Sequence, residues 1–209
     1  TQRIRGFRGD KVTPGISEFA RNLTQLADYM RPMFKGAARF IPKEQRPQTY
    51  VFIKGTAGMR LLPAETQEEI YDALVAGLQA DPQFPFQLRR EDHGTISGEL
   101  EGFYAVLAAN FLGGRVNGSL VLAPGSKGAI GALDMGGGST QVVMHSGSND
   151  LAHSPLQMEH FQLRSFLSFG SATLRQRVFD QLTTHAVRER RLFFKTKVKD
   201  RVPNPCGFA

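Results

Sequence analysis

Residues 131–141 read Gly-Ala-Leu-Asp-Met-Gly-Gly-Gly-Ser-Thr-Gln, and this stretch decides the fold. An apolar run from Ala129 to Leu133 ends in the carboxylate of Asp134, and a second apolar run begins at Val142. Three consecutive glycines between two apolar runs are typical of a tight turn. The order therefore predicts a strand, a turn and a second strand.

The same turn has the residue types of an anion site. Glycine leaves backbone N–H groups open to close approach by an anion, and Asp134 stands at the mouth of the turn. Its carboxylate can hold a divalent cation directly or through water. We interpret the stretch as a nucleotide-handling site, the alternative being a plain hairpin with a glycine-rich tip. It is not the usual P-loop, because no Gly-Lys-Ser/Thr follows the glycines.

The composition is that of a soluble globular protein. The 209 residues suffice for one large domain or two small ones, and 41% of them are hydrophobic. No apolar run reaches the length of about 18 residues that a membrane span needs. The single cysteine, Cys206, says nothing about the redox compartment.

Positive charge gathers near the C-terminus and contributes much of the formal net charge of +7. A basic stretch of this kind is either a nucleic-acid or membrane-surface patch or the solvated surface of a phosphate-handling protein. No recognised nucleic-acid motif surrounds it, which favours the solvated surface. The residues are Arg188, Arg190, Arg191, Lys195, Lys197, Lys199 and Arg201.

Helical and strand patterns alternate along the chain, so the predicted fold class is α/β. Helices are expected at 17–33, 64–78, 101–112 and 172–182, and strands at 49–54, on both sides of the triple glycine and at 158–163. Thr66 and Glu69 have the spacing of a capping box for the second helix.

Residues 54–63, Lys-Gly-Thr-Ala-Gly-Met-Arg-Leu-Leu-Pro, form a second candidate loop between a predicted strand and a predicted helix. Its N–H groups and the Thr56 hydroxyl suit an oxyanion, and Arg60 adds positive charge. The alternative is a simple turn with Gly58 at positive φ, and for this motif alone the simple turn is the better interpretation.

Residues 98–104, Gly-Glu-Leu-Glu-Gly-Phe-Tyr, offer Glu99 or Glu101 as a general base. Such assistance contributes about 10²–10⁴ in rate. The alternative is that acidic residues at a helix start complement the helix dipole, and this is favoured when the motif is taken alone.

In this order the three motifs resemble those of the apyrase family, the nucleoside triphosphate diphosphohydrolases. The resemblance runs through Gly58–Pro63, through Glu101–Tyr104 with Asn110–Leu112, and through Leu133–Val142, which look like the second, third and fourth signature regions of that family. Weaker family segments are 11–17, 165–170 and 204–206.

The resemblance implies a ribonuclease-H-like fold of the actin/sugar-kinase superfamily, with two lobes that close on a nucleotide. Residues 1–97 would form part of the N-terminal lobe. Residues 98–209 would form part of the C-terminal lobe together with the basic C-terminal stretch. Both lobes would be incomplete.

The resemblance also implies roles for individual residues. Glu101 matches the catalytic base, and Asp134 matches the carboxylate that holds Ca²⁺ or Mg²⁺ through water. Ser139 is placed near the attacking water, and Gln141 matches a residue of the metal shell or one that orients water. Thr56 would be catalytic as well, because Thr56 and Ala57 match the loop beside the attacking water and the terminal phosphate. The phosphate and nucleotide contacts would come from Ala57, Gly58, Arg60, Gly136, Gly137 and Gly138.

The expected activity is stepwise hydrolysis of nucleoside tri- and diphosphates, with no specific nucleic-acid partner. The family normally works outside the cytoplasm, at the cell surface, secreted or in the Golgi lumen, and membrane anchoring would come only from segments outside this chain. Two glycosylation sequons, at Asn22 and Asn117, agree with that location.

The chain departs from the family pattern at several points. The first and fifth signature regions are absent, there is no tryptophan, and Gly55 and Arg164 stand where alanine and histidine are common. We therefore expect an internal piece of a larger apyrase, which by itself hydrolyses inefficiently. The alternatives are a related phosphatase or kinase, such as an exopolyphosphatase or a sugar kinase, and a non-catalytic nucleotide-binding module.

Overall fold

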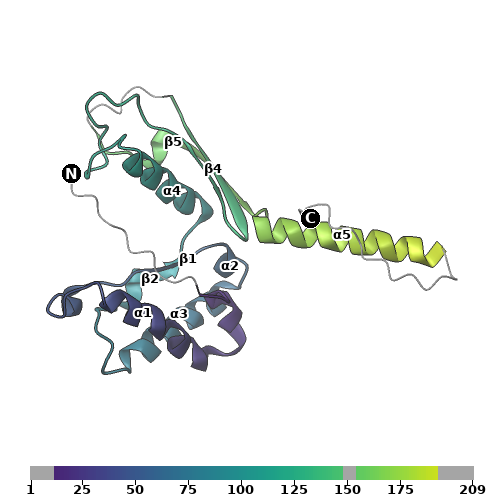
Figure 1. Ribbon diagram of the computed structural model, residues 1–209, viewed down its shortest axis with the longest axis horizontal. Coiled ribbons are helices and arrows are strands. Elements are labelled where there is room, and N and C mark those ends of the chain that lie inside the picture. The colour runs from purple at the N-terminus through teal and green to yellow at the C-terminus, as the bar shows by residue number, and fades with distance from the viewer. Residues whose placement is uncertain (1–11, 148–153, 193–209) are drawn as a thin grey trace. The chain divides into compact units, whose positions relative to one another are not determined.

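The computed structural model describes residues 12–147 and 154–192 of the chain. It divides into two compact units, Thr1–Ser97 and Gly98–Ala209, and each is described here by itself (Figure 1). The assignment of these units to the two lobes of an apyrase stays a prediction.

The first unit is built on two short parallel strands, β1 (Ile53–Gly55) and β2 (His93–Thr95). Parallel strands need a crossover connection, and here it contains α2 (Ala57–Arg60) and α3 (Ala64–Gln79). The helix α1 (Leu26–Ala38) packs on α3 (Figure 1).

The core of this unit lies between α1 and α3. Ile70, Leu74 and Leu78 recur at every fourth position of α3 and are fully buried, which is the stripe that an amphipathic helix presents to its partner. A Cβ added to Gly77 would lie 2.6 Å from the Cβ of Ala27, so a glycine lets the two helices approach closely.

The helix predicted at 17–33 is wrong in its type and its bounds. Two 3₁₀ helices, Ile16–Arg21 and Leu23–Gln25, precede α1, which extends to Ala38. Asn22 separates the two 3₁₀ helices with a non-helical backbone (φ −152°, ψ 73°). The apolar spacing that indicated an α-helix also fits a helix with three residues per turn.

Two further expectations for this unit need correction. The capping box of Thr66 and Glu69 is absent, because α3 begins after Pro63 without a side-chain cap. The strand expected at 49–54 is mostly a bridge between Tyr50 and Gln87, and only the last residues join β1.

The second unit is an antiparallel sheet in the order β3-β4-β5 with α4 (Gly98–Leu112) packed against one face (Figure 1). The strands are β3 (Ala132–Met135), β4 (Ser139–His145) and β5 (Phe161–Leu167). Val106 of α4 meets Val143 and Phe161 of the sheet in a buried core. The strand, turn and strand around the triple glycine are confirmed.

The remaining elements of this unit differ from expectation in their bounds. Met158–His160 is a 3₁₀ helix, so the strand begins later than predicted and extends further. The last helix, α5 (Ser171–Leu192), is longer than predicted. Cys206 and the basic residues from Lys195 to Arg201 lie outside the described residues. None of the helices in the described ranges combines the length and hydrophobicity that a membrane crossing requires.

Candidate functional site

A close approach of α4 to β4 places the predicted base, Glu101. A Cβ added to its neighbour Gly102 would lie 3.0 Å from Cγ2 of Val143 and 3.3 Å from Cβ of Gln141. Because glycine has no Cβ, the helix backbone comes close enough for a side-chain contact between the two elements. Gln141 Nε2 donates to Glu101 Oε2 at 3.2 Å.

Gln141 is the centre of a polar cluster in the second unit. Its side chain is 1% exposed, and Nε2 also lies 2.8 Å from Ser139 Oγ and 3.1 Å from Ser165 Oγ. A carboxamide has only two N–H hydrogens, so three oxygens share them. An ionised carboxylate only accepts hydrogen bonds, which means that the amide nitrogen must face Glu101.

That orientation leaves Gln141 Oε1 as a buried acceptor with no hydrogen-bond partner among the described residues. A buried polar atom without a partner costs about 1–3 kcal/mol. An acceptor in this position beside a carboxylate suits a bound water or another small donor.

The strand register brings Asp134 to the same cluster. Asp134 pairs with Gln141, and Gln141 pairs with Ser165 on the other side. Side chains directly opposite each other lie on the same face of a sheet, and α4 covers this face. The structure thus gathers the predicted Glu101, Asp134, Ser139 and Gln141 in one place, and it adds Ser165.

The triple-glycine turn, residues 136–138, is tied to the start of α5. The carbonyl oxygens of Gly136 and Gly137 accept from the N–H groups of residues 171–173 at 2.9–3.2 Å, and the Gly138 carbonyl accepts from Ser168 at 2.8 Å. The first N–H groups of α5 are therefore engaged by the turn.

The amides of the turn itself remain as candidates for an anion. The Gly136 N–H donates to the Ser139 carbonyl, whereas no backbone carbonyl in the described part of the chain accepts from Gly137 or Gly138. The turn packs tightly against Gly170, where an added Cβ would lie 2.4 Å from the Gly137 carbonyl carbon. The need for glycine at position 170 could not be predicted from the sequence.

The donor chemistry of the cluster fits a hard cation. Among the side chains that the structure describes, those of residues 12–147 and 154–184, no three from His, Cys, Asp or Glu are arranged to hold a metal. Mg²⁺ keeps several waters and is usually bound by one or two carboxylates plus substrate phosphates, so it does not need a protein cage. Asp134 and the Gln141 carbonyl supply oxygen donors of that kind.

The predicted loop of the first unit follows β1 directly. Thr56 precedes α2, and Ala57 is buried, while Gly58 lies inside α2 without a positive φ, so the simple turn with a left-handed Gly58 is wrong. Arg60 donates to the Ile96 carbonyl at 3.0 Å. Its guanidinium therefore braces the loop against the residue that follows β2.

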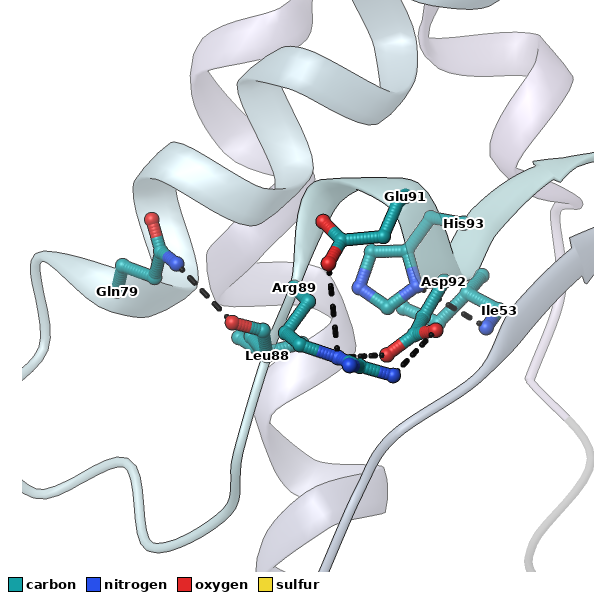
Figure 2. A network of polar contacts seen from close by, with 7 residues as sticks. All are labelled: Ile53, Gln79, Leu88, Arg89, Glu91, Asp92 and His93. Carbon is teal, nitrogen blue, oxygen red and sulfur yellow. Dashed lines mark hydrogen bonds and ion pairs between the residues drawn. The ribbon is translucent and has the colours of Figure 1, made fainter.

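A second polar network supports the start of β2 (Figure 2). Arg89 donates twice to Asp92, at 2.7 and 3.0 Å, and the N–H of Ile53 donates to Nδ1 of His93 at 3.3 Å. His93 is 5% exposed, and burial lowers its pKa. An imidazole that accepts at Nδ1 and is buried is neutral and carries its proton on Nε2.

Sequence reasoning assigned no role to Ser165, Gly102 or Tyr71. Ser165 reaches the site only through the pairing of β4 with β5, and Tyr71 reaches Gly55 across 16 residues of chain. Both relations depend on register and packing. Two signals were available in the sequence: Gly102 directly follows the candidate base, and Ser165 is the first residue of the weaker family segment 165–170.

Comparison with known proteins identifies the family of this chain. The model of the GDA1/CD39 (nucleoside phosphatase) family matches residues 2–200. The chain belongs to this family. It is 36% identical over 160 residues to the nucleoside-diphosphatase mig-23 of Caenorhabditis elegans, an alignment covering 73% of this chain and 28% of that protein.

Human ectonucleoside triphosphate diphosphohydrolase 4 is 32% identical over 224 residues, covering 88% of this chain and 36% of that protein. The chain thus spans about a third of the length of these relatives. A crystal structure of nucleoside triphosphate hydrolases from Neospora caninum matches 82% of this chain and 34% of that chain, with a TM-score of 0.51 and 24% identity. This likeness confirms the predicted α/β fold, whereas membership of the actin/sugar-kinase superfamily stays a prediction.

Proposed function

We propose that the full-length protein hydrolyses nucleoside tri- and/or diphosphates to monophosphates and phosphate by metal-assisted attack of water. The observation that carries the proposal is the cluster around Gln141, where Glu101, Ser139 and Asp134 meet on one face of a sheet. The names of the relatives, a nucleoside-diphosphatase and an ectonucleoside triphosphate diphosphohydrolase, support the same substrate class.

Each residue of the cluster has a distinct task in the proposed reaction. Glu101 takes a proton from the attacking water, and Gln141 Oε1 accepts a hydrogen bond from that water and holds it beside the carboxylate. Ser139 fixes the Gln141 amide and faces the same water. In the second unit the Gly137 and Gly138 amides bind phosphate oxygens, and in the first unit Thr56 and Ala57 are separate candidates for a phosphate contact.

Asp134, with Gln141 beside it, would hold Ca²⁺ or Mg²⁺. When bound, the cation neutralises charge on the phosphate oxygens and so makes the phosphorus easier to attack. Arg60 keeps its positive charge while one of its N–H groups donates to the Ile96 carbonyl, so it adds charge beside the loop of the first unit.

The test is the substitution Glu101→Gln in the full-length protein. Phosphate release from ATP, ADP and UDP is measured with Ca²⁺ or Mg²⁺, and kcat should fall by about 10²–10⁴ because the base is lost. Glu99→Gln is the matched control, since Glu99 lies in the same first turn of α4 but is exposed. It should leave kcat unchanged.

Chelation of divalent cations should abolish phosphate release from the wild-type protein, and added Ca²⁺ or Mg²⁺ should restore it. Full activity of the Glu101→Gln protein would show that the base assignment is wrong. Undiminished activity in the chelator would show that the metal is not needed.

We also propose an extracytoplasmic location, at the cell surface, secreted or in the Golgi lumen. Both sequon asparagines, Asn22 and Asn117, are exposed, which an acceptor for N-glycosylation requires. The Asn117 Oδ1 accepts from the backbone N–H groups of Ser119 and Val121, which forms a local turn at the surface.

A further inference from the structure

The hydroxyl of Tyr71 lies between the ends of the two parallel strands of the first unit. It accepts from the N–H of Gly55 at 3.1 Å and lies 3.1 Å from Thr95 Oγ1. Gly55 and Thr95 are register partners and the last residues of β1 and β2. The Tyr71 side chain is fully buried, and this burial raises its pKa, so the hydroxyl keeps its proton and can donate it to Thr95.

Gly55 is glycine because of this hydroxyl. A Cβ at position 55 would lie 2.2 Å from the Tyr71 oxygen and 2.6 Å from Cγ of Met59. The backbone of Gly55 has no positive φ, so its conformation alone would admit alanine. A side chain at position 55 is therefore excluded by a steric clash, mainly with Tyr71 and to a smaller extent with Met59.

The contact bears on the loop that follows. Thr56 and Ala57 come directly after Gly55, and the Gly55 carbonyl accepts from the Ile96 N–H at 3.0 Å. Both polar groups of the Gly55 backbone are thus held, one by α3 through Tyr71 and one by the residue after β2. The direction in which the chain leaves β1 is set by these two bonds.

We infer that Tyr71 is a positioning residue for the Thr56–Ala57 loop and that it acts through a mutual fit with Gly55. The effect on rate rests on the proposed function, because it requires that this loop contacts the reacting phosphate. The fit itself is a property of the first unit and does not depend on any activity.

The first experiment removes only the hydroxyl, with Tyr71→Phe in the full-length protein. The loss of one buried hydrogen bond at the loop should lower kcat for nucleotide hydrolysis about fivefold, with KM changed less than about twofold. The control is Tyr29→Phe, which also removes one hydrogen-bonded tyrosine hydroxyl from the same unit; the Tyr29 hydroxyl donates to the Pro14 carbonyl. It should leave kcat unchanged. Equal kcat for wild type and Tyr71→Phe would overturn the inference.

The second experiment tests the mutual fit by rescue. Gly55→Ala alone should lower kcat more than about tenfold, because the new methyl group displaces the loop or Tyr71. Adding Tyr71→Phe removes the closest contact and should restore kcat at least about threefold. If the two positions did not fit against each other, the losses in the two variants would be independent, so a double variant no better than Gly55→Ala would contradict the proposal.

If the wild-type protein hydrolyses no nucleotide, the proposed function is wrong, but the fit between Gly55 and Tyr71 is not yet tested. The thermal unfolding midpoints of the wild type, Gly55→Ala, Tyr71→Phe and the double variant then test it. Gly55→Ala should lower the unfolding midpoint less in the Tyr71→Phe background than in the wild type. If Gly55→Ala alone does not fold, recovery of folded double variant would support the fit equally. Equal decreases in both backgrounds would overturn the inference.

Discussion

The single amide nitrogen of Gln141 lies within hydrogen-bond distance of three side-chain oxygens, and these contacts fix how its carboxamide is oriented. Ser139 comes closest, at 2.8 Å, and Ser165 and Glu101 follow at 3.1 and 3.2 Å. The two serines approach from β4 and β5, so the amide is held from two strands while its oxygen points elsewhere. The direction of Oε1 is therefore set by residues that need not touch the substrate.

Ser165→Ala tests this arrangement. Without the hydroxyl of Ser165 the Gln141 amide loses one of its anchors, and kcat for nucleotide hydrolysis should fall about fivefold, the effect of one neutral hydrogen bond. Ser146→Ala is the control, because Ser146 Oγ donates to the His160 carbonyl at 2.8 Å on the exposed part of the same unit. Steady-state kinetics of both variants measures the effect, and a loss that is equal in the two proteins would argue against a role for Ser165.

At the level of elements, the site depends on how closely α4 lies against the sheet. Glycine at position 102 removes the side chain that would otherwise separate them, and Glu101 enters the cluster as a consequence. The triple-glycine turn is held by its hydrogen bonds to the start of α5. The geometry of the candidate site is thus a result of backbone packing.

Gly102→Ala should therefore impair both folding and activity. The added methyl group would lie 3.0 Å from Val143, which is buried in the core, and overpacking of this kind destabilises by about 1–3 kcal/mol. The helix must also move away from Gln141, so kcat should fall by more than the loss of folded protein explains. Denaturant unfolding and kinetics are compared with Gly36→Ala, where a Cβ in α1 meets open space. A stable, fully active Gly102→Ala protein would refute the packing argument.

Local sequence patterns were sufficient to predict an element whose signals all lie within its own residues and the turns beside it. The helices near 64–78 and 101–112 and the two strands around the triple glycine follow from periodicity and turn residues, and the structure has them close to the expected bounds. The motif order also pointed to Glu101, Asp134, Ser139 and Gln141, which the structure gathers in one cluster. Their catalytic roles stay predictions.

Long-range relations could not be predicted from the sequence. Ser165 enters the cluster through the register of β4 with β5, and a shift by one residue would move it to the other face. Gly55 is explained mainly by Tyr71. Gly170 is explained by its contact with Gly137 and Gly138, which come more than 30 positions earlier in the chain. The stretch before α1 was misread because 3₁₀ and α-helical spacing overlap over a few turns.

At the scale of the whole molecule, stability depends on pH through every group whose proton affinity changes on folding. His93 is such a group, because burial lowers its pKa in the folded protein. The positive charges of Lys54 and Arg90 add to that effect, and Asp92 opposes it. The unfolded chain binds a proton at His93 below about pH 6.5, where the folded protein does not. The free energy of unfolding must therefore decrease as the pH falls through that window.

His93→Asn isolates this contribution in the full-length protein. Asparagine does not titrate, and its side-chain oxygen can still accept from the N–H of Ile53, which donates to Nδ1 in the wild type. Denaturant unfolding at pH 7, 6 and 5 should show the wild type losing stability relative to the variant, with a difference in slope of at most about 1.4 kcal/mol per pH unit. The difference in slope should vanish below the folded-state pKa of His93, where the folded and the unfolded protein both bind the proton. If the free energy of unfolding changed with pH equally in both proteins, His93 would bind a proton as readily in the folded state as in the unfolded state. That result would contradict the argument from its burial and its hydrogen bond with Ile53.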